Sequence, residues 1–155
     1  MIFVGQSSGC SKASSGNTEY FSIQGREFLD KGSILVAANS SGTNYQTYHA
    51  NFAEVVGLFA NLKGIWPNDK VDGLSDFQNA IDMWVLTNDI WGRRMISRGY
   101  EYPTNTQSEV IAKARTRYPD IKQDGSIDDV IAQYLASASL DFAAGREKLQ
   151  RALNK

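Results

Sequence analysis

Apolar residues recur at alternating steps of three and four between residues 73 and 99, which is the spacing of one helix face. Ser75 followed by Gln78 matches a capping box, and Gly99 stands where a helix can end in a left-handed cap. The pattern predicts an amphipathic helix with two buried tryptophans. Its stripe consists of Leu74, Phe77, Ile81, Trp84, Trp91 and Met95, with Asn88 in the one gap.

Three further segments show the same helical period. A helix is predicted from Thr43 to about Lys63, a shorter one from Thr106 through Tyr118, and a long one from Ser126 to about Ala152. Serines and a glycine inside the last segment leave open whether it forms one helix or two. The apolar stripe of the last helix consists of Ile127, Ile131, Tyr134, Ala138, Phe142, Gly145, Leu149 and Ala152. The apolar stripe of the helix from Thr43 consists of Tyr45, Tyr48, Phe52, Val55, Val56, Phe59 and Leu62.

The first 42 residues lack such a stripe and favour short strands. Residues 19–23, 26–29 and 33–38 are rich in strand-forming side chains, and glycine-containing turn signals separate them. We therefore expect a mainly α (α+β) fold in a single domain, 1–155. An extended or antiparallel β region, 1–42, would pack on a four-helix bundle-like core, 43–155.

Composition narrows the class of protein. The chain has 155 residues, of which 42% are hydrophobic and 21% charged, with a net charge of -1, so a globular protein is expected. Cys10 is the only cysteine, which excludes an intramolecular disulfide. The beginning of the chain lacks the features of a secretory signal, and no apolar run reaches membrane-spanning length. We expect residence in a cytoplasm or within an assembled particle such as a virion, and no membrane partner.

Candidate chemistry is sparse. The glycine-rich stretch from Gly5 to Gly9 is one residue too short for a phosphate-binding loop, and Lys12 is not adjacent to it. His49 is the only histidine, and a thiol dyad with Cys10 would rest on two isolated residues. We predict instead that His49 is a half-buried ring at a helix interface.

Two acidic loops resemble calcium-binding loops but depart from their pattern. In residues 120–131 and 68–79 a lysine takes the third position, and the twelfth position lacks the bidentate glutamate. Aspartates near a helix start are explained by capping and by the helix dipole. We expect no catalytic residue, no cofactor and no metal.

Charge alternates in blocks along the chain. Residues 67–92 contain five acids and one base, whereas residues 93–117 contain six bases and two acids. The basic block, with tyrosines beside it, is a candidate nucleic-acid or partner-binding patch, although helix-end charges explain much of it. Its members are Arg93, Arg94, Arg98, Lys113, Arg115 and Arg117.

These observations favour a non-enzymatic structural or interaction protein. We predict a self-assembling subunit, such as a virion or phage structural component, whose partners are copies of itself. Residues 5–18 have little apolar surface, so Ile2, Phe3 and Val4 before them are candidate assembly contacts. One alternative is a small hydrolase of a polymer that uses acids such as Asp69, Asp72 or Asp76. Another is a helical nucleic-acid-binding protein that uses the basic patch.

Overall fold

The computed structural model describes residues 13–67, 71–96, 105–121 and 127–154. Within these ranges the chain forms helices and no strand. The helices are α1 (Ala13–Ser40), α2 (Tyr45–Gly64), α3 (Leu74–Ile96), α4 (Asn105–Arg117) and α5 (Ile127–Leu153).

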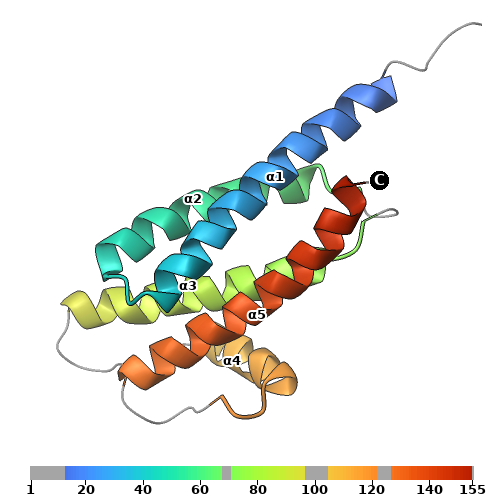
Figure 1. The fold of residues 1–155 in the computed structure, drawn as a ribbon. Coiled ribbons are helices and arrows are strands. Elements are labelled where there is room, and N and C mark those ends of the chain that lie inside the picture. Colours follow the sequence, from blue (N-terminus) through green and yellow to red (C-terminus); the bar gives the residue numbers. More distant parts are fainter. Residues whose placement is uncertain (1–12, 68–70, 97–104, 122–126, 155) are drawn as a thin grey trace, which may run out of the picture.

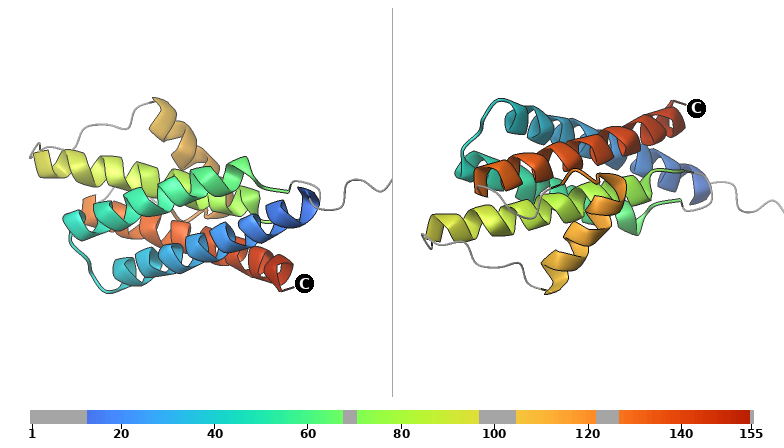
Figure 2. Two further views of the ribbon diagram at one scale, coloured as in Figure 1. Left: turned by 90° about the horizontal axis from the view of Figure 1, so that it is seen from above. Right: turned by 90° about the horizontal axis from the view of Figure 1, so that it is seen from below.

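The four longer helices pack as an antiparallel bundle (Figure 1). α1 contacts α2 and α5, and α3 contacts α2 and α5, so that each long helix has two long neighbours. α4 lies outside this group and packs on α3. Figure 2 shows from two further sides that the start of α1 and the end of α5 lie at the same end of the bundle. The expectation of a helical bundle is thus confirmed.

The predicted β region is wrong wherever the structure describes it. Residues 19–23, 26–29 and 33–38 all belong to α1, and the helix also includes residues 13–18. The glycines interpreted as turns are contact points with α5. Gly25 faces Leu149 and Leu153, and a Cβ on Gly32 would lie 2.3 Å from the Phe142 ring. The expected strand at residues 2–4 lies outside the described residues.

The helices predicted after residue 42 are confirmed, with shifted starts. Asn44, rather than Thr43, caps α2, because its side-chain oxygen accepts a hydrogen bond of 2.9 Å from the Thr47 amide. α3 begins at Leu74, which places Ser75 inside its first turn. α5 is one uninterrupted helix, which resolves the alternative that had been left open.

Aromatic rings from three helices form the centre of the core. Phe28 of α1 lies 4.9 Å from Phe77 of α3 and 5.7 Å from Phe142 of α5, measured between ring centroids. Trp84 is fully buried beside Phe142, and its carbonyl oxygen accepts a 2.9 Å hydrogen bond from the Tyr48 hydroxyl. Burial of these rings supplies the main apolar stabilisation of the bundle.

The stripe of α3 reaches the surface at its C-terminal end. Trp84 is buried as predicted, but Trp91 is only partly buried against Tyr45 and Tyr48 of α2. Met95, predicted to share the buried stripe, is 57% exposed. The predicted stripe therefore continues beyond the part of α3 that the core covers.

The Gly32 contact predicts opposite effects for two glycine substitutions. Gly32→Ala should lower the free energy of unfolding by about 1 to 3 kcal/mol, because the new methyl group would overlap the Phe142 ring. Gly57→Ala in α2 is the matched control, since a Cβ there meets nothing within 4 Å. It should raise stability by up to about 1 kcal/mol through helix propensity. Denaturant unfolding of both variants measures the difference, and equal effects would contradict the close approach of α1 and α5.

The position of the core along α3 can be tested in the same way. Trp84→Ala should cost about 3 to 5 kcal/mol of unfolding free energy, as large core deletions do. Met95→Ala, four residues from the partly buried Trp91, should change stability by less than about 0.5 kcal/mol because its side chain is exposed. A large loss at Met95, or free access of a quencher to Trp84, would show that the helix is rotated.

Candidate functional site

The basic candidates that the structure describes lie on α3 and α4, and Arg94 binds an acid of α5. Its guanidinium donates to both carboxylate oxygens of Asp128. This hydrogen bond is the main cause that raises the pKa of Arg94 and lowers the pKa of Asp128. Both side chains are well exposed, so the pair fixes orientation more than it stabilises the fold.

Arg117 belongs to a more buried network between α4 and α5. Its Nη2 donates to Oδ2 of Asp141 at 2.9 Å, and its Nη1 donates to the Lys113 carbonyl at 3.0 Å. The Tyr118 hydroxyl donates to Oδ1 of Asp141 at 3.0 Å, so both carboxylate oxygens are used. Burial, followed by the nearby Asp141 charge, raises the pKa of Tyr118 to about 12. The network ties the end of α4 to the buried Asp141.

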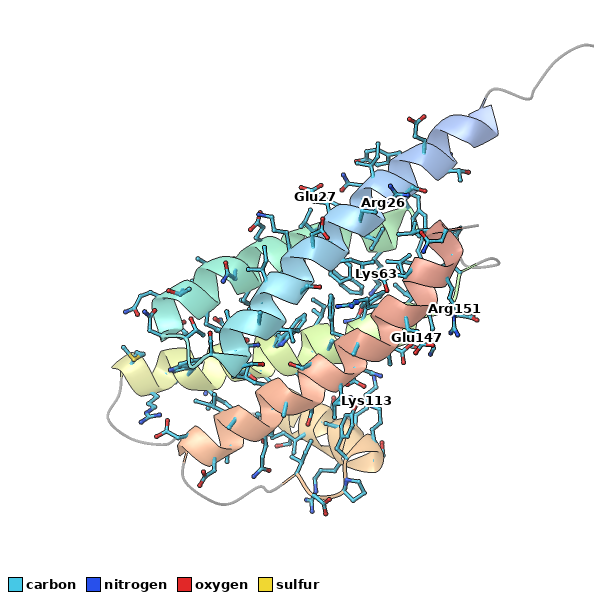
Figure 3. The ribbon with its side chains drawn as sticks, viewed as in Figure 1. Arg26, Glu27, Lys63, Lys113, Glu147 and Arg151 are labelled. Atoms are coloured by element: carbon cyan, nitrogen blue, oxygen red, sulfur yellow. The ribbon has the colours of Figure 1, made fainter. Side chains whose placement is uncertain are left out.

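The other basic candidates differ in their surroundings. Lys113, labelled in Figure 3, lies 3.9 Å from a carboxylate oxygen of Asp82 on α3. Arg115 is exposed, Arg93 interacts within the chain, and Arg98 lies outside the described residues. At least three of the five candidates that the structure describes therefore have acidic partners in their own chain. This favours structural charge pairing over a patch of uncompensated phosphate-binding cations.

The acids considered for hydrolysis form no catalytic pair that the structure describes. Asp76 accepts a 2.7 Å hydrogen bond from the Lys148 ammonium group, which fixes it as an ion pair. Asp72 is exposed at a hollow of about 440 Å³, and Asp69 lies outside the described residues. Within the described part of the chain, no three His, Cys, Asp or Glu side chains gather as a metal site would require.

His49 links α2 to α3, although it is more exposed than predicted. Its Nδ1 lies 2.8 Å from the side-chain oxygen of Asn88, within hydrogen-bonding distance. The ring also packs near Tyr45 and Phe52. These contacts give His49 a structural role at the interface of the two helices. Cys10, whose pairing with His49 as a thiol dyad was not favoured from the sequence, lies outside the described residues.

The outer face of α1 exposes three large apolar side chains. Tyr20 is 52% exposed, Ile23 55% and Ile34 52%. Ile23 and Ile34 are eleven residues apart, which is about three helical turns, so they lie on one side of the helix. Exposed Glu27 and Asp30 lie between them at steps of three and four. Figure 3 shows Glu27 on the side of α1 that faces away from α3 and α5.

Sequence reasoning missed this surface because the residues were assigned to strands. The signal was present as the spacing 20, 23, 27, 30 and 34, which is a second helical stripe beside the buried one. Next to it, Lys31 donates across to α2, with its Nζ 2.7 Å from a carboxylate oxygen of Glu54. We call Tyr20, Ile23, Glu27, Asp30 and Ile34 the α1 outer face.

The candidate assembly residues Ile2, Phe3 and Val4 lie outside the described part of the chain, so that expectation stays a prediction. No family model matches this chain, and no significant match is found among curated proteins or solved structures. None of the helices that the structure describes has the length and apolar content needed to cross a membrane.

The Arg117 network predicts a stability difference between two aspartates that both bind an arginine. Asp141→Asn should lower the free energy of unfolding by about 1 to 3 kcal/mol, because it removes a buried carboxylate that pairs with Arg117. Asp128→Asn is the matched control and should change stability little, because its pair with Arg94 is exposed. Equal losses in thermal or denaturant unfolding would contradict a structural role of the buried network.

Proposed function

We propose that this chain is a non-enzymatic structural subunit that associates with copies of itself through the α1 outer face. The observation that supports the proposal is the alignment of half-exposed Tyr20, Ile23 and Ile34 along one helix. Single exposed apolar residues are ordinary on protein surfaces, but an aligned set on one face is typical of interaction sites. Burying these side chains against a neighbour would supply the central apolar part of an interface.

The charges between the apolar side chains favour a particular kind of contact. In a two-fold contact of the α1 outer face with itself, Glu27 and Asp30 of one copy would face the same acids of the other. Such like-charge pairs are unfavourable. They are avoided when the α1 outer face of one copy contacts a different surface of the next copy. We therefore propose a heterologous contact, which builds rings or filaments. That geometry fits a repeated component of a larger assembly, such as a virion or phage particle.

The charged residues support this function over the alternatives. Arg94, Lys113 and Arg117 bind acids of their own chain, which leaves less positive charge for nucleic acid. Asp76 binds Lys148, which reduces its availability as a general base for hydrolysis. These charged groups are thus paired within the chain, whereas the exposed apolar side chains of the α1 outer face are available to a partner.

A matched pair of variants tests the association surface. Ile34→Glu should weaken self-association at least about tenfold in dissociation constant, because it places a further negative charge in the proposed contact. Leu140→Glu on α5 is the control, since Leu140 is a 57% exposed apolar residue that belongs to another helix than the α1 outer face. Sedimentation velocity and light scattering over a range of concentrations measure the effect, with circular dichroism to verify that both variants keep their helices.

Two results would contradict the proposal. One is a wild-type protein that stays monomeric at high concentration. The other is equal association of the Ile34→Glu and Leu140→Glu variants. A biological contact of this kind should bury more than about 1,000 Å² in total, and a structure of the assembled form would measure that area directly.

A further inference from the structure

A pocket opens between the first turns of α1, the connection from α2 to α3 and the last turn of α5. The start of α1 and the end of α5 lie at the same end of the bundle (Figures 1 and 2). Its volume is about 430 Å³, within the range of ordinary binding sites. Apolar side chains from all three parts of the chain line it, including those of Phe21, Ile65, Val71 and Leu153.

The chemistry of this end pocket selects an apolar occupant. None of the described residues that line it is charged, and its polar members are Asn17, Thr18 and Ser22 of α1. A charged ligand would lose its hydration there without gaining a counter-charge from these described residues. An apolar side chain would instead cover Ile65 and Leu153, which are now partly exposed.

The chain carries a matching segment directly before α1. Residues 1–12 precede Ala13, and their apolar residues after Met1 are the consecutive triplet Ile2, Phe3 and Val4 and the single Cys10. The lining residues of α1 lie between about 6 and 14 Å from Ala13 along the helix axis. The eight residues from Gly5 to Lys12 reach about 26 Å when extended. The triplet can therefore return to the pocket of its own chain.

We propose that the end pocket receives Ile2, Phe3 and Val4 of the same chain. A Gly/Ser-rich link of eight residues has a root-mean-square length of about 15 Å, close to the distance it must cover. A link of this length gives a local concentration of the triplet in the millimolar range, above that of any free copy in dilute solution. The triplet that occupies the pocket is therefore expected to come from the same chain rather than from a neighbouring copy. This proposal does not depend on association through the α1 outer face.

Cys10 provides the test, because it is the only cysteine and can carry a single nitroxide label. The Ile34→Glu protein carries the nitroxide at Cys10 and isotope-labelled methyl groups. It is diluted into an excess of Ile34→Glu protein that has neither label, so that contacts between two labelled copies are rare. Methyl signals of Ile65, Val71 and Leu153 should lose intensity, whereas that of Leu140 should not. The same sample with the nitroxide reduced gives the reference intensities.

Two substitutions of equal charge separate specific docking from mere proximity. Phe3→Asp should reduce the signal loss at the pocket, because a carboxylate is unfavourable among apolar walls. Ser7→Asp adds the same charge within the link and should leave the signal loss in place. If both variants reduce the signal loss, or if neither does, the proposal is overturned.

A mixed sample identifies the source of the segment. Nitroxide-labelled protein without isotopes is combined with isotope-labelled Cys10→Ser protein. Under the proposal this mixture shows no signal loss at Ile65, Val71 or Leu153. A loss of methyl signal in the mixture alone would show that the segment comes from a second copy. If neither sample lost signal at Ile65, Val71 or Leu153, the triplet would not occupy the pocket. Both results overturn the proposal and leave the association measured with Ile34→Glu unaffected.

Discussion

The close approach of α5 to both α1 and α3 is the constraint on which the rest of the bundle depends. The Phe142 ring occupies the space that a side chain at position 32 would need, and the Phe77 ring does the same at Gly145. These two glycines let three aromatic rings from α1, α3 and α5 meet within 6 Å of one another. Interior packing tolerates little change in volume, so this arrangement sets the distance between the helices.

This close approach also determines which side of α1 faces solvent. Phe21, Phe28 and Leu35 point into the bundle, which turns Ile23 and Ile34 outward. An ordinary surface helix has one apolar side, whereas α1 also exposes the apolar side chains of Tyr20, Ile23 and Ile34 on its outer side. These exposed apolar side chains favour a surface for association as the function of α1.

Charged residues have a different part in the molecule. Lys148 joins α5 to α3, Arg117 joins α4 to α5, and Lys31 joins α1 to α2. Such pairs add orientation to a bundle whose free energy comes mainly from apolar burial. The alternating acidic and basic blocks of the sequence are therefore explained in part by contacts between helices of one molecule. The members of these blocks that are paired in this way have less free charge to offer a highly charged ligand.

The sequence by itself determined α2, α3, α4 and α5, because each has a regular apolar stripe and turn-forming residues beside it. The tertiary structure decided α1. Its apolar residues are divided between two sides, which weakens the periodic signal, and Gly25 and Gly32 resemble turns until the partner helix is present. Tertiary packing also left Met95 exposed and buried Asp141 beside Arg117. A one-dimensional pattern records which side chains are apolar, but the neighbouring helix decides which of them are covered.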